Sequence, residues 1–178
     1  MSVFSKFYQR KSGIDTFFQR GVIVKKDGLT VAKIAVATFD TADTDSSGVS
    51  NKTIAAHGLG VYLPDNAVIT RTWFDVITTF TSAGANAGTI ALKVQSANDL
   101  SSALAISDER AMFDAGMHQC IPNSWMDGGG TVTALIQAAA RATSWIKLTA
   151  ERELIATVAT QLLTAGKLVL YVEYVISE

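Results

Sequence analysis

One stretch of the sequence decides the fold: Lys167-Leu-Val-Leu-Tyr-Val-Glu-Tyr-Val-Ile176. Large apolar side chains occupy every second position, namely Leu168, Leu170, Val172, Tyr174 and Ile176, which is the period of a β-strand. Val169, Tyr171 and Val175 make the opposite face apolar as well. A strand that is apolar on both faces is expected in the middle of a sandwich or at a subunit interface.

Further strands are predicted wherever short β-branched or alternating runs are bounded by turn residues. They cover residues 21–26, 29–37, 90–94, 131–136, 144–149 and 154–159, with two more between residues 52 and 80. Asp27-Gly28 predicts a hairpin turn, because glycine accepts the positive φ of a tight turn, and Pro64 predicts a second turn. Short strands at this spacing indicate an all-β fold, a β-sandwich of the jelly-roll type.

The remaining segments are predicted to be loops and one helix. Residues 39–51 are small and polar and are expected to form a surface loop, residues 82–88 a turn and residues 114–130 a long loop. A short helix is expected over residues 98–106, with Asn98 or Asp99 as its N-cap. The strand over residues 67–80 is expected to be central and covered on two sides, one bearing Val68, Phe74, Val76 and Phe80 and the other Ile69, Trp73 and Ile77.

Composition predicts one domain that holds together by packing alone. Of 178 residues, 48% are apolar and 17% are charged, a balance typical of all-β or oligomeric proteins that hide apolar surface between subunits. The single cysteine, Cys120, excludes an internal disulfide. No apolar run has the length of a membrane-spanning helix and the first residues lack a signal-peptide core, so we expect synthesis in the cytosol and no membrane partner.

Charge divides the chain into an arm and a body. Residues 1–26 carry six basic and one acidic side chain, net +5, which leaves −6 for residues 27–178. We therefore expect residues 1–26 to form an extended N-terminal docking arm and residues 27–178 to form the β-sandwich body. The expected partner contacts are Phe4, Phe7, Tyr8, Arg10, Lys11, Phe17, Phe18 and Arg20. The alternative is that some of these aromatics complete the protein's own core.

The two histidines and the cysteine give little support for catalysis or metal binding. His57 has no nucleophile elbow of the form Gly-x-Ser-x-Gly, so we interpret it as a structural histidine. His118 and Cys120 are spaced to face a metal from one strand, but a closed zinc site needs four ligands. Cys120 is therefore interpreted as a small buried hydrophobe.

Acidic pairs are the other candidates for chemistry. Asp108 with Glu109, and Glu151 with Glu153, offer the carboxylates that a glycosidase needs, but closeness in sequence does not establish the facing geometry. We expect both pairs on solvated turns. The glycine-rich stretches at residues 83–88 and 128–130 lack the lysine of a P-loop and are interpreted as turns. No enzymatic activity, cofactor or metal is expected.

A protein is the expected partner of the basic arm. Nucleic acid is disfavoured, because the acidic body repels phosphate. A second class of function is a glycan-binding jelly roll of a host-recognition fibre, which stacks sugars on an exposed tryptophan. Trp73 and Trp145 lie in predicted strands and are expected in the core, which leaves Trp125, in its loop, as the candidate.

Two stretches resemble small virion structural proteins of tailed bacteriophages and prophages. The first covers residues 56–92 and begins Ala56-His-Gly-Leu-Gly-Val-Tyr-Leu-Pro-Asp-Asn; the second covers residues 163–175 and begins Leu163-Thr-Ala-Gly-Lys-Leu-Val. The resemblance implies a capsid decoration (cement) protein that binds and stabilises the head shell. It further implies a homo-oligomer, with a trimer favoured, whose partner is the major capsid protein or another virion protein. Tail, neck and head-fibre proteins reuse similar sandwiches and form the alternative.

Overall fold

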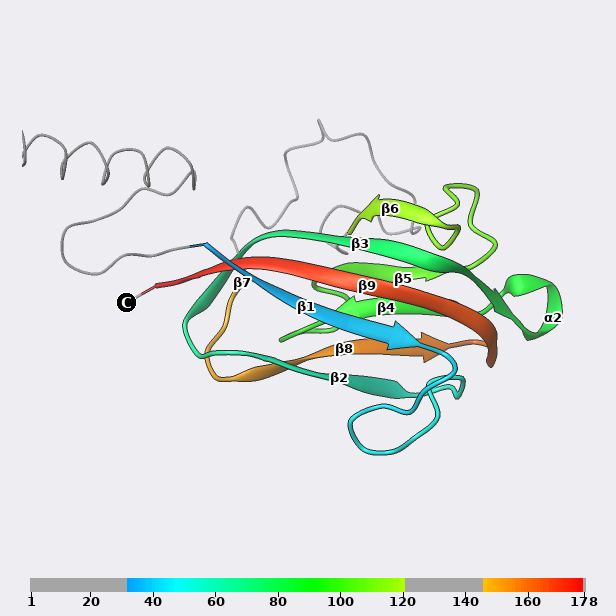
Figure 1. The fold of residues 1–178 in the computed structure, drawn as a ribbon, viewed down its shortest axis with the longest axis horizontal. Coiled ribbons are helices and arrows are strands. Elements are labelled where there is room, and N and C mark those ends of the chain that lie inside the picture. Colours follow the sequence, from blue (N-terminus) through cyan, green and yellow to red (C-terminus); the bar gives the residue numbers. More distant parts are fainter. Residues whose placement is uncertain (1–31, 121–145, 178) are drawn as a thin grey trace, which may run out of the picture.

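The computed structural model describes residues 32–120 and 146–177, which form a sandwich of two antiparallel sheets (Figure 1). The strands are β1 (Lys33–Asp40), β2 (Ala56–Leu63), β3 (Ala67–Ser82), β4 (Thr89–Lys93), β5 (Ser101–Ala105), β6 (Gly116–Gln119), β7 (Ile146–Lys147), β8 (Arg152–Ala159) and β9 (Leu163–Ile176). A single helical turn, α2 (Ala83–Asn86), joins β3 to β4. It is the one helix in the described ranges and is far too short to cross a membrane.

The strand order identifies a jelly roll. One sheet has the order β1-β9-β3-β6, with β7 also paired to β3, and the other has the order β2-β8-β4-β5. The chain changes sheet between β1 and β2, β2 and β3, β3 and β4, β5 and β6, β7 and β8, and β8 and β9, whereas β4 and β5 form a hairpin within one sheet. The predicted all-β, jelly-roll sandwich is thus confirmed.

β9 lies in the centre of its sheet, as the sequence predicted. It pairs along its length with β1 on one side and β3 on the other, and Figure 1 shows it in red between them. Leu168, Leu170 and Val172 are completely buried between the sheets. They pack against a phenylalanine cluster that fills the core, made of Phe39, Phe74, Phe80 and Phe113.

β3 is also central, but its faces differ from the prediction. Phe74, Val76 and Phe80 are buried as expected. The pairing with β9 shifts register between Ile69 and Arg71, however, and a β-bulge of this kind exchanges the two faces of a strand. Ile69 therefore lies in the core, whereas Val68 is outside it. Placing Val68 with the core face and Ile69 opposite is wrong for this reason.

Two shorter segments also differ from the prediction. The helix over residues 98–106 is wrong, because residues 101–105 form β5. The Asp99 carboxylate accepts hydrogen bonds from the amides of Val94, Gln95 and Ser96, so it caps the turn that precedes it instead of a helix that follows. The predicted loop 114–130 contains β6 at residues 116–119. The predicted strand over residues 144–149 contains only the two residues of β7 within the described range.

Candidate functional site

The outer surface of the β1-β9-β3-β6 sheet carries large apolar side chains. Ile34 and Val36 of β1, Ile77 of β3 and Met117 of β6 are each at least half exposed, and Met117 reaches 62%. Within the described residues, Tyr62 is the one large apolar side chain of comparable exposure on the strands of the other sheet. Exposed apolar side chains that gather on one face of a small domain indicate an interaction surface.

The strand register places Val36 in a row with three further outward-facing side chains, one from each of the other three strands. Val36 lies opposite Tyr171, Tyr171 opposite Trp73, and Trp73 opposite Gln119. The rings of Trp73 and Tyr171 stack, with centroids 5.4 Å apart and planes 6° from parallel. A cross-strand aromatic pair of this kind stabilises the sheet by about 1 kcal/mol.

Trp73 is the clearest correction to the sequence analysis. It was expected in the core, but it is half-buried and stands on the outer face, while its neighbour Phe74 fills the core. Alternation alone places Trp73 opposite Phe74, and the face on which Trp73 stands also carries the exposed Ile77, so it is the outer surface of the sheet and not a second buried layer. The face that we name the Trp73 face comprises Val36, Tyr171, Arg71, Trp73, Met117 and Gln119.

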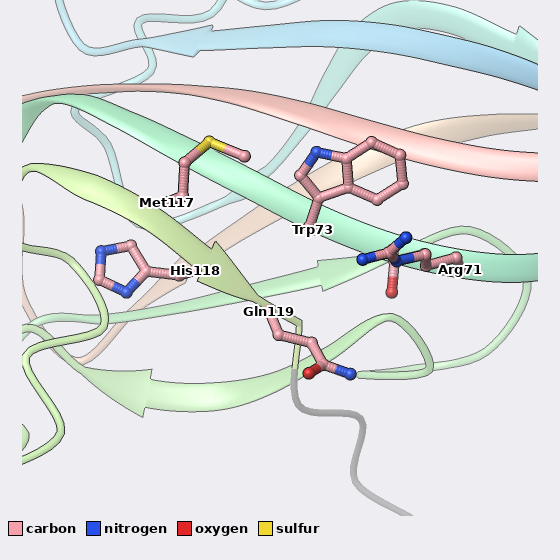
Figure 2. Close-up of a pocket in the computed structure, with 6 residues that line it drawn as sticks. Arg71, Trp73, Met117, His118 and Gln119 are labelled. Carbon is pink, nitrogen blue, oxygen red and sulfur yellow. The ribbon is translucent and has the colours of Figure 1, made fainter.

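A hollow of about 310 Å³ lies at the β6 end of the Trp73 face (Figure 2). Its walls come from β3 and β6 and consist of Arg71, Thr72, Trp73, Met117, His118 and Gln119. The central guanidinium carbon of Arg71 lies 5.3 Å from the centroid of the Trp73 ring, a cation–π distance. His118 stacks on Phe74 at 5.5 Å, and its Nε2 lies 2.8 Å from the Asp114 carbonyl oxygen.

The Arg71 charge is not neutralised by any carboxylate in the described ranges. The ion pairs found there join His57 to Asp45, Arg110 to Asp108, and Lys167 to Asp40. Glu173 is the register partner of Arg71, but its carboxylate accepts a 2.7 Å hydrogen bond from the Thr70 hydroxyl. Among residues 32–120 and 146–177, the hollow therefore presents a cation that lies over an aromatic ring and has no carboxylate partner.

His57 has the structural environment that the sequence analysis proposed. Its ring is fully buried, with Nδ1 3.1 Å from Asp45 Oδ2 and Nε2 2.9 Å from the Thr53 carbonyl oxygen. Both partner atoms are oxygens that can accept a hydrogen bond from the ring. Hydrogen bonds from the Ser47 hydroxyl, the Val49 amide and His57 hold the pKa of Asp45 well below its usual range. This buried pair ties the loop after β1 to β2.

Cys120 is a buried hydrophobe, as expected. It is 1% exposed, and burial raises the pKa of its thiol to about 12. Among residues 32–120 and 146–177, no three His, Cys, Asp or Glu side chains are grouped so that they could hold a metal ion.

In each of the two acidic pairs, Asp108 with Glu109 and Glu151 with Glu153, one carboxylate bonds to a different part of the protein. Asp108 lies on a turn and forms a 2.6 Å ion pair with Arg110, whose hydrogen bond lowers the pKa of Asp108. A general acid needs the opposite shift. Glu153 lies in strand β8, not on the expected turn, and accepts a 2.8 Å hydrogen bond from the Gly60 amide.

Several predicted features lie outside the described residues. They are the arm contacts within residues 1–26, the Asp27-Gly28 turn, the strand over residues 131–136, and both Trp125 and Trp145. The arm and the Trp125 glycan platform therefore stay predictions.

Comparison with known proteins places the fold among phage capsid structures. No family model matches the chain, and neither does any curated protein. A chain of the cyanophage Pam1 capsid asymmetric unit is similar over 88% of this chain and 93% of that one, with a TM-score of 0.51 and 16% identity. A chain of the Ralstonia phage GP4 capsid is 18% identical, with a TM-score of 0.47 over 88% of this chain and 92% of that one.

The third similar structure is a chain of the acid-stable capsid of Helicobacter pylori bacteriophage KHP30, at 13% identity and a TM-score of 0.49. It covers 83% of this chain and 89% of that one. All three chains come from phage capsids. At these identities the similarity shows a shared fold alone, and the cyanophage chain is the one of the three with a TM-score above 0.5.

Proposed function

We propose that the chain is a non-enzymatic structural protein of a phage virion that binds and stabilises the head shell as a decoration protein. The observation that carries this proposal is the jelly roll, which matches nearly the whole length of a chain in the cyanophage capsid. The Trp73 face supports it, since a sandwich with one exposed apolar face is suited to docking on another protein.

The mechanism is one of linked equilibria. A protein that binds the assembled shell, and not its free subunits, shifts the assembly equilibrium toward the shell. Affinity grows when contacts are spread over several subunits, because the second contact forms at a high effective concentration. A homo-oligomer, with a trimer favoured, supplies this multivalency. A basic arm over residues 1–26 adds a further contact to the major capsid protein or another virion protein. The protein is made in the host cytoplasm and ends in the virion.

Tail, neck and head-fibre roles are the alternative, because similar sandwiches serve them. The alternative function of a glycan-binding head fibre is not supported by Trp73. Tyr171 stacks on the Trp73 ring and the Arg71 guanidinium lies over it, so the indole is engaged within the protein. Sugar binding through stacking needs a free aromatic face.

Co-sedimentation with capsids assembled without the protein tests the proposal. The full-length chain and a chain lacking residues 1–20 are each checked for folding by circular dichroism and then mixed with the capsids. We expect the full chain to sediment with capsids and to raise their melting temperature, and we expect the shortened chain to bind more weakly. A folded full-length chain that stays in the supernatant would exclude the decoration role and favour the tail or a fibre.

A further inference from the structure

We propose that the Trp73 face docks on a neighbouring virion protein and that Arg71 receives a carboxylate side chain of that partner in the hollow. This inference rests on the proposed function and goes beyond it, because it names a second contact, separate from the N-terminal arm, and the chemistry of the group that this contact accepts.

The residue types of the Trp73 face are those that dominate binding energy in protein interfaces. Tryptophan, tyrosine and arginine are enriched among residues whose truncation weakens a complex most, and methionine is enriched in interfaces generally. Here Trp73 contacts both Tyr171 and Arg71, and Met117 lines the same hollow with 62% of its surface exposed. The face therefore has an aromatic centre with a neighbouring charge.

Arg71 is prepared for an anion before the partner arrives. Its guanidinium lies over the Trp73 ring, and Trp73 is itself fixed by stacking on Tyr171, so little side-chain freedom remains to be lost on binding. The planar guanidinium pairs with a carboxylate through two parallel hydrogen bonds. Gln119 lines the same hollow and supplies a further polar side chain, whereas the Thr72 side chain hydrogen-bonds the Cys120 thiol.

The surrounding charges favour one carboxylate over a polyanion. Asp75 follows Trp73 by two residues on β3, and Glu173 is the register partner of Arg71 on β9. The body outside the arm carries a net charge of −6. A nucleic acid backbone would meet these negative charges, whereas a single acidic side chain needs only Arg71. The exposed Ile34 and Val36 extend the contact with apolar surface, which favours a protein over a small acidic sugar.

The test uses full-length protein and capsids assembled without it. Arg71→Glu places like charges together, and Trp73→Ala removes the aromatic centre. Lys93→Glu is the matched control, because it reverses a charge on β4 of the other sheet. We expect the first two variants to bind capsids at least about 30-fold more weakly, and the control to remain within about twofold of the wild type. The affinity of Arg71→Lys should lie between those of the wild type and Arg71→Glu, because lysine keeps the positive charge but lacks the planar guanidinium that binds a carboxylate through two hydrogen bonds.

Each outcome separates this inference from the function on which it rests. Wild-type protein that does not bind capsids overturns both. Wild-type binding that Arg71→Glu and Trp73→Ala leave unchanged, with thermal unfolding showing that both variants fold, overturns the inference alone. If light scattering shows that Arg71→Glu changes the protein's own oligomeric mass, the face belongs to a second copy and the partner assignment is wrong. Loss of capsid binding with unchanged mass supports it.

Discussion

Replacing Gly166 by alanine is expected to be the most damaging small substitution on β9. Gly166 has a φ of +140°, a backbone conformation that residues with a side chain rarely adopt. An added Cβ would also overlap the ring of Phe80. That ring is 1% exposed, stacks on Phe39 at 6.0 Å and meets Phe113 edge-on at 5.9 Å. It has no space into which it can move without disturbing the core.

Two costs combine in Gly166→Ala. Holding alanine at a positive φ costs about 1–2 kcal/mol. Forcing an extra methyl group into packed core costs about 1–3 kcal/mol. The free energy of unfolding should therefore fall by about 2–5 kcal/mol, a large part of the stability of a domain of this size.

Urea unfolding followed by tryptophan fluorescence measures the change, with Gly60→Ala as the control. Gly60 has a φ of +68° and nothing within 4 Å of its added Cβ, so it should lose only the backbone part. In a Phe80→Ala background the overlap disappears, and Gly166→Ala should then cost less than in the wild-type background. Equal losses from Gly166→Ala and Gly60→Ala in the wild-type background would refute the packing argument.

Three other predictions concern single side chains. The Cys120 thiol, with its pKa near 12, should resist iodoacetamide at about pH 8 in the folded chain and react fully in urea, and rapid labelling of folded protein would contradict its burial. The lowered pKa of Asp45 stabilises the fold above the unfolded-state pKa of 3.8, and this contribution is lost as the pH falls through the folded-state value. Asp45→Asn should therefore lower the melting temperature more at about pH 7 than at about pH 3, and equal shifts at both would argue against this origin. Leu170→Ala should lower the free energy of unfolding in urea by about 2–5 kcal/mol, whereas Tyr171→Ser should lower it by about 1 kcal/mol and weaken capsid binding. A larger loss of stability from Tyr171→Ser than from Leu170→Ala would show that the inner and outer faces of β9 are assigned wrongly.

The architecture was largely predictable because it depends on alternation, which the sequence displays directly. β9, the core face of β3 from Phe74 to Phe80, and the turn at Pro64 were all predicted correctly. The errors arose where a single residue changes which face of a strand the following side chains occupy, or which segment a side chain caps. The bulge after Ile69 leaves no mark in composition. The sequence around Asp99 also does not show whether its carboxylate accepts hydrogen bonds from amides before it, as it does, or from the amides of a helix after it.

The candidate site was harder to predict. Trp73 was assigned to the core because tryptophan in a strand is usually buried, and its sequence context does not show that this face of β3 is exposed. His57 was recognised as structural, but its partner Asp45 lies in a polar loop where no periodicity marks one acid among several. Arg71 and Met117 had no signal of their own. Their joint position depends on the pairing of β3 with β6, which joins residues 40 to 46 positions apart, a separation consistent with the long loop closures of β-sandwiches.

The one signal that could have located the Trp73 face was the second apolar face of β9. A central strand in a two-layer sandwich needs apolar residues only on its inner side, where Leu168, Leu170 and Val172 already complete the core. Val169 and Tyr171 on the other side add nothing to that core, and exposed apolar surface favours aggregation unless something covers it. An apolar outer face on a buried central strand is thus better explained by assembly than by folding. On that argument the surface that we propose to dock on a virion protein is formed by β9 and β3.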